Sequence, residues 1–107
     1  MAEHDAMMAR FVHDYLELLD HRVSSIRNHL EQRNFMTAHV ALLSLESTSV
    51  MVGAGQLAQA AGRLREAVEL GERDTVPALL AVVSTEAEHT RVELAEAPPD
   101  AGSDHSG

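Results

Sequence analysis

Hydrophobic residues recur at helical spacing along most of the chain. Between residues 5 and 32 they fall three or four positions apart, as expected for one face of an amphipathic helix: Val12, Leu16, Leu19, Val23, Ile26 and Leu30. Phe11 and Tyr15 widen this face, and charged residues between them predict a solvated opposite side. The polar stretch 32–34 predicts a short connection.

The next predicted helix begins near Asn34, a residue type that favours the N-cap position. It carries many apolar side chains, including Leu42 and Leu45, and they are not confined to one side. Glu46 is the only Asp, Glu, Lys or Arg between residues 34 and 62. Such a stretch is either buried on several faces or kept for a partner.

Glycines mark the following boundaries. Gly53 and Gly55 bracket a predicted turn, and Gly71 is well placed to end the third helix. Asp74 or Thr75 is expected to cap a fourth helix, which runs to about residue 96.

Apolar alternation typical of strands is absent from the sequence, so the predicted fold is all-α, an antiparallel four-helix bundle with short loops. The bundle is expected to span 1–96. Residues 97–107 are rich in Pro, Gly, Ser and Asp and predict a disordered tail.

Composition narrows the function. The 107 residues carry 17 acidic and 8 basic side chains, a formal net charge of −9, and all the basic ones are arginine. We therefore expect neither nucleic acid nor an anionic membrane as the main partner, because both need a positive surface. The absence of cysteine excludes thiol chemistry and makes the cytoplasm the default location. Neither a signal peptide nor a membrane-spanning run is predicted.

Two local patterns suggest chemistry only weakly. His13, Glu17 and His21 recur every fourth residue and could share a divalent metal, but they equally fit a solvated helix face. No second cluster supports a metal, so none is expected, and no cofactor is implied. Serines and threonines at 44–49 lie near His39, but such runs usually bond back to their own helix.

Residues 43–54 and 56–68 resemble a histidine-containing phosphotransfer (HPt) domain. The family's motif, His-x-x-Lys-Gly-Ser-Ser, is followed about ten residues after the His by a Gly-Ala step, which Gly53 and Ala54 match. Other segments also match the family pattern: the helix that follows, the short Gly-Asp loop at 71–74, the last helix and the opening segment 11–16. The resemblance therefore covers about residues 8–96. It implies a four-helix bundle that passes phosphoryl groups between receiver domains.

Departures from this motif fall where the chemistry takes place. When the motif is aligned on Gly53, Leu43 occupies the position of the phosphoryl-accepting His. Glu46 occupies the position of the Lys, and Ser47 that of the Gly that follows it. Leucine cannot accept a phosphoryl group, and a carboxylate repels one where a cation would stabilise it. These substitutions predict a loss of phosphotransfer.

His39 is the alternative acceptor, one helical turn before Leu43. Its use would move the reacting group by about 6 Å along the helix, at 1.5 Å per residue. A receiver domain positioned for in-line transfer would then be displaced. If His39 is nevertheless active, the protein is a phosphoryl carrier rather than an enzyme that turns over.

Three functional hypotheses remain open from the sequence. The leading one is a phosphotransfer-inactive HPt-like module that docks a receiver domain or a histidine kinase through Val40, Leu43, Ser44, Glu46, Ser47 and Gly53. The second is active transfer through His39. The third is a self-associating bundle, a homodimer whose interface is the weakly charged second helix.

Overall fold

The computed structural model describes residues 2–96, with side chains placed from residue 6 to residue 95. Within this range the chain forms four helices and no strand: α1 (Ala2–Glu31), α2 (Phe35–Met51), α3 (Gly55–Leu70) and α4 (Val76–Glu96). The predicted all-α four-helix fold is therefore confirmed. The predicted tail, 97–107, lies outside the described residues.

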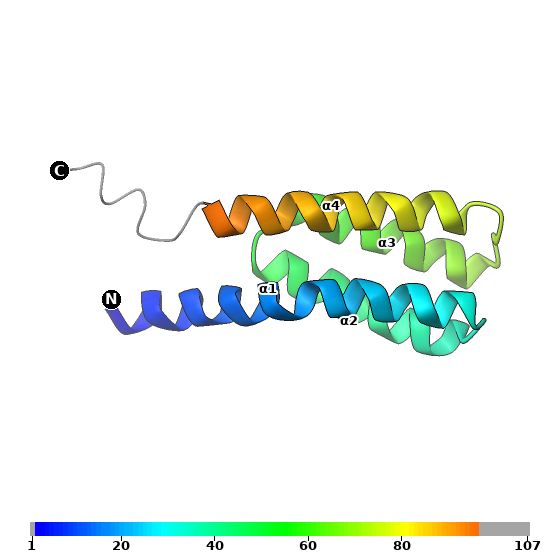
Figure 1. Ribbon diagram of the computed structural model, residues 1–107. Helices are drawn as coiled ribbons and strands as arrows, with labels where there is room; N and C mark the ends of the chain where they lie inside the picture. Colours follow the sequence, from blue (N-terminus) through cyan, green and yellow to red (C-terminus); the bar gives the residue numbers. More distant parts are fainter. Residues whose placement is uncertain (1, 97–107) are drawn as a thin grey trace.

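The helices form a square in which each contacts two neighbours. α1 packs against α2 and α4, and α3 packs against the same two, whereas the diagonal pairs make no close backbone contact. Figure 1 shows that the chain reverses direction at each short connection. Each connection contains a residue in the left-handed region: Arg33 (φ 61°) after α1, Gly53 (φ 83°) after α2 and Gly71 (φ 72°) after α3. Only the two glycines adopt this conformation without steric cost.

The core is almost entirely aliphatic. Its fully buried large side chains come from all four helices: Leu19, Ile26, Leu42, Leu45, Leu57, Leu64 and Val83. Along α1 the buried positions are Tyr15, Leu19, Val23, Ile26 and Leu30, so Val12 and Leu16 of the predicted stripe are only partly buried. Small residues of α3, including Ala60 and Ala61, allow its neighbours to approach closely.

α1 is much longer than its partners. Its 30 residues span about 45 Å, against about 25 Å for the 17 residues of α2, at 1.5 Å per residue. Figure 1 shows its N-terminal part extending beyond the α2–α3 connection. Met7, Met8 and Phe11 on this extension form a shallow apolar pocket with Met51.

The predicted caps are correct in position but not in chemistry. Asn34 precedes α2, yet its side chain makes no capping bond and donates instead to Gln32. Thr75 precedes α4, and its hydroxyl donates to the carbonyl of Glu72. In each case another acceptor within the connection satisfies the polar group of the side chain.

A polar pair, Tyr15 and Ser49, lies within the core contacts between α1 and α2. The Tyr15 hydroxyl and Ser49 Oγ are 2.8 Å apart, and both residues are almost fully buried. Burial raises the pKa of Tyr15 above its usual value of 10.0, although the Ser49 contact opposes this. The pair fixes which faces of the two helices meet, because two almost fully buried hydroxyls must find each other across the interface.

We expect Tyr15→Phe and Ser49→Ala each to lower the free energy of unfolding by about 1–2 kcal/mol, because each leaves a buried hydroxyl without its partner. The double variant should cost less than the sum of the two, since it removes both polar groups. Urea denaturation followed by circular dichroism measures all four proteins of this cycle. Strictly additive losses would show that the two hydroxyls do not interact.

Candidate functional site

The outer side of α2 carries an exposed apolar stripe. We call Met36, Val40, Leu43, Ser47 and Val50 the α2 outer face; their spacings of four, three, four and three residues place them along one side of the helix. Four of the five are large hydrophobic residues, with exposed fractions from 42% for Leu43 to 84% for Met36. The opposite side of α2, with Leu42 and Leu45, is completely buried. α2 is therefore apolar on both sides.

Leu43, the residue at the place of the phosphoryl acceptor, faces outward. Its exposed fraction of 42% excludes an inward, core-packed position. Val40, Ser44 and Ser47 of the predicted docking set are also exposed. Ser44 Oγ accepts a hydrogen bond from Arg22 of α1 at 2.9 Å. The structure thus brings these four predicted docking residues to one surface.

Glu46 points away from that stripe and toward α3. Its carboxylate accepts a hydrogen bond from Arg65 Nε at 2.9 Å and lies over Gly62. A Cβ added at Gly62 would be 2.9 Å from Glu46 Oε2, so a larger residue there would shift the end of this flexible side chain. The negative charge expected beside Leu43 is therefore compensated by an arginine that the sequence pattern did not indicate.

His39 belongs to the same polar network. Its Nε2 lies 2.5 Å from Glu69 Oε2, and Glu69 also accepts from Arg65 Nη1 at 2.9 Å. The chain of contacts His39–Glu69–Arg65–Glu46 thus joins α2 to α3. Hydrogen bonds from His39 and then Arg65 hold the pKa of Glu69 below its usual value of 4.5. At neutral pH this group is a carboxylate and can only accept hydrogen bonds.

This contact determines what His39 can do chemically. Because Glu69 can only accept, Nε2 carries the proton in the pair and has no free lone pair with which to attack phosphorus. The carboxylate also places negative charge at the nitrogen furthest from the backbone. Both effects oppose the acceptance of a phosphoryl group at Nε2.

The hydroxyl groups that follow His39 are engaged elsewhere. Thr48 Oγ1 donates to the carbonyl of Ser44 on its own helix, as predicted for such a run. Ser49 is buried against Tyr15. Neither of these hydroxyls is held beside His39 as a nucleophile.

The group of possible metal ligands on α1 differs from the one considered in the sequence. His13, Asp14 and Glu17 bring their ligand atoms within 4.8 Å of one another, whereas His21 is not part of the group. All three are exposed, and His13 and Glu17 are 3.4 Å apart. This geometry is that of solvated side chains one turn apart on one helix.

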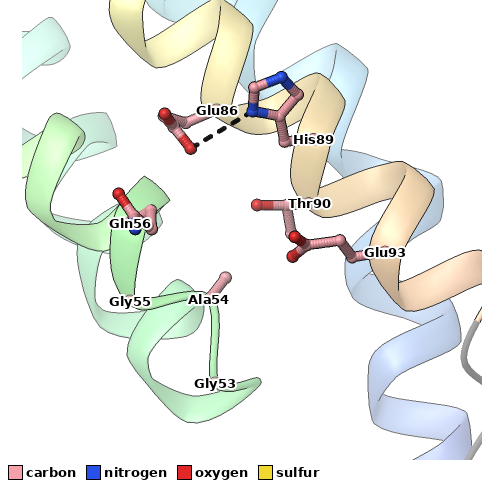
Figure 2. Close-up of a pocket in the computed structure, with 8 residues that line it drawn as sticks. All are labelled: Gly53, Ala54, Gly55, Gln56, Glu86, His89, Thr90 and Glu93. Atoms are coloured by element: carbon pink, nitrogen blue, oxygen red, sulfur yellow. Dashed lines mark ion pairs between the residues drawn. The ribbon is translucent and has the colours of Figure 1, made fainter.

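A polar pocket, which the sequence did not predict, lies between α4 and the α2–α3 connection. Residues 53–56 form one wall, and Glu86, His89, Thr90 and Glu93 form the other (Figure 2). Gly53, assigned from the sequence to the docking set, lines this pocket. The recurrence of Glu86, Thr90 and Glu93 on one side of α4 is a signal that was available in the sequence.

Comparison with known proteins identified no relative of this chain. No protein-family model, no curated protein and no solved structure matches the chain. Within the described residues, no helix has the length and hydropathy required to cross a bilayer.

We expect His39→Ala to raise the pKa of Glu69 toward 4.5, because the variant removes the hydrogen bond that lowers it most. Arg65→Gln should act in the same direction. Conversely, the wild-type contact stabilises the fold above the unfolded-state pKa of Glu69, and this contribution is lost as the pH falls through the folded-state value. An NMR titration of the Glu69 carboxyl measures both shifts, with His13→Ala as the control. An unchanged Glu69 pKa in His39→Ala would contradict the contact.

Proposed function

We propose that the protein is an HPt-like signalling module that docks a receiver domain or a histidine kinase and does not itself transfer phosphoryl groups. The observation that carries the proposal is the exposure of Leu43, at the place where the resemblance puts the phosphoryl acceptor. The partners proposed are intracellular signalling proteins, so the proposal includes a cytoplasmic location.

Docking is supported by the character of the α2 outer face. Val40 and Leu43 are exposed by 61% and 42%, and Val50 extends the surface toward the end of the helix. Burial of apolar surface contributes about 25 cal/mol per Å², so this stripe favours a partner over water. Exposed aliphatic residues aligned along one helix suit an apolar surface on that partner.

Inactivity in transfer is supported by two contacts beside the stripe. Glu69 occupies the Nε2 side of His39, and Glu46 and Arg65 form a closed ion pair where the resemblance calls for a free cation. A phosphoryl group arriving here would meet two carboxylates, and Arg65, the cation bonded to both, is already shared between them.

A homodimer through the same face is a second candidate, favoured by the symmetry of the stripe. In an antiparallel pairing about Leu43, Met36 would face Val50 of a second copy, and Val40 would face Ser47. The stripe itself contains no charged residue, so two copies would not repel each other there despite the net charge of −9.

We expect Leu43→Asp to weaken binding of the partner at least tenfold, because it places a charge at the centre of the apolar face. The measurement is surface plasmon resonance with purified receiver domains and kinase dimerisation domains from the source organism. Val82→Asp is the matched control, since Val82 is 46% exposed on α4, which does not contact α2.

Failure of every such domain to bind would overturn the proposal, as would equal binding by the two variants. Loss of a dimer in Leu43→Asp, seen by light scattering without any binding of a signalling domain, would favour the second candidate. Circular dichroism of each variant verifies that the helices remain intact.

Incubation with phosphorylated receiver domains should leave this protein without label. The reason is that Leu43 has no acceptor atom and Nε2 of His39 is held by Glu69. Detection of acid-labile phosphate on the protein is the measurement, with an active HPt protein as the positive control. Label that appears on the wild type and disappears in His39→Ala would establish active transfer instead.

A further inference from the structure

The seam between α1 and α2 runs beside the α2 outer face and carries two hollows. One lies at the end of α2, has a volume of about 250 Å³ and is lined by apolar residues: Met7, Met8, Phe11 and Met51. The other, of about 320 Å³, lies further along the same two helices and is lined by Leu18, His21, Arg22, Ser25, Ala41 and Ser44. Ser44 adjoins Leu43 in the sequence, so the second hollow borders the α2 outer face.

Methionine is concentrated on this side of the molecule. All four methionines whose side chains the structure describes are exposed, by 42–84%: Met7, Met8, Met36 and Met51. Of the eleven exposed large hydrophobic residues in the described range, eight lie on α1 and α2 and three on α3 and α4. A flexible, polarisable thioether adapts to partners of different shape, and contiguous exposed apolar surface is typical of an interaction site. The exposed apolar surface therefore favours the α1–α2 side of the bundle for binding.

The spacing of the two hollows matches a helix. Phe11 lines one hollow and Leu18 the other, and these two residues are about 10 Å apart along α1, at 1.5 Å per residue. A helix lying along the seam repeats side chains on one face at the same interval, every seven residues. Side chains on one face of a strand recur about every 7 Å, so a strand would place them at about 7 and 14 Å and miss one hollow. The seam therefore suits a helix better than a strand, in the manner of other helix-binding grooves.

Arg22 gives the seam its charge. It is half-buried, and its Nη1 donates to the neutral Ser44 Oγ at 2.9 Å. Arg65 and Arg91 bond to glutamates, whereas no carboxylate of the described residues pairs with Arg22. A guanidinium has five N–H donors, so Arg22 retains donors for a partner. Covering it with apolar surface alone would leave a buried charge without compensation, which is costly. A partner that covers the seam must therefore bring a carboxylate to this point.

We propose that the docking partner lays an amphipathic helix along the α1–α2 seam. Two apolar side chains of that helix, seven residues apart, fill the two hollows, and an aspartate or glutamate beside them pairs with Arg22. This inference rests on the proposed function for the presence of a partner, and it adds the element and the charge by which the partner is recognised. The net charge of −9 disfavours a partner that is acidic as a whole, so we expect the carboxylate to be a local feature of the helix.

The test uses a model peptide of about 18 residues, which spans about 27 Å as a helix. The peptide carries leucine at three positions along one face, the outer two seven residues apart, with one glutamate beside them and otherwise alanine and glutamine. We expect fluorescence anisotropy to show saturable binding to the full chain, at least fivefold weaker when the peptide glutamate is replaced by glutamine. Arg22→Gln should weaken binding of the glutamate peptide at least fivefold and have little effect on the glutamine peptide.

Arg63→Gln is the matched control. It removes the same charge from an exposed position of α3, which makes no close backbone contact with α1, and should bind the peptide like the wild type. NMR shifts should locate the bound peptide at Leu18, Ala41 and Ser44, and circular dichroism verifies that both variants stay folded.

Absence of saturable binding by the glutamate peptide would overturn the inference, as would equal affinity for the two peptides or unchanged binding by Arg22→Gln. The proposed function fails separately: peptide binding that requires Arg22, without any receiver or kinase domain that binds, would reject the signalling partner and keep the seam. A signalling domain whose binding is lost in Leu43→Asp but unchanged in Arg22→Gln would keep the proposed function and reject the seam. A dimer of the full chain that excludes the peptide would also overturn the inference, because it would assign the seam to a second copy.

Discussion

Burial of aliphatic side chains between α2 and its neighbours α1 and α3 determines the orientation of every other group on α2. Leu42 and Leu45 are completely buried, and with 3.6 residues per turn this leaves Val40 and Leu43 no position except the outside. Rotating the helix to cover Leu43 would expose two core leucines, at about 2–5 kcal/mol each by analogy with their truncation. The exposed face is thus enforced by the packing of the core.

Polar contacts then remove the remaining freedom. Tyr15 and Ser49 fix the register of α1 against α2 from inside, because a slip of either helix would separate two buried hydroxyls. Two contacts fix α3 against α2 from outside: Arg65 with Glu46, and Glu69 with His39. This surface network contributes little stability, as exposed pairs generally do. Its effect is instead chemical: it occupies Nε2 of His39 and the carboxylate of Glu46 at the same time.

The sequence predicted the helices well because their signals are local. Heptad spacing, Gly53 and Gly71 depend only on neighbouring residues, and all four helices begin and end within a few positions of the prediction. The docking hypothesis required Leu43 to face outward, but spacing alone left this open, because apolar residues occur on both sides of α2. The burial of Leu42 and Leu45 decides it. In contrast, the Arg65–Glu46 pair joins residues 19 positions apart on different helices. Nothing in a single sequence specifies such a pair, since any of the eight arginines could serve.

The polar pocket escaped prediction for a related reason. Thr90 stands among polar residues, a pattern typical of a solvated helix face, and it is buried only because α4 packs against α3 and α1 in the bundle. Gly53 lies between the two regions: it ends the connection from α2 and lines the pocket at the same time. α2 and α4 nevertheless lie on a diagonal of the bundle and do not touch, so Leu43 and Thr90 share no contact. Substitutions at these two residues are therefore expected to be energetically independent, and each site can be judged without reference to the other.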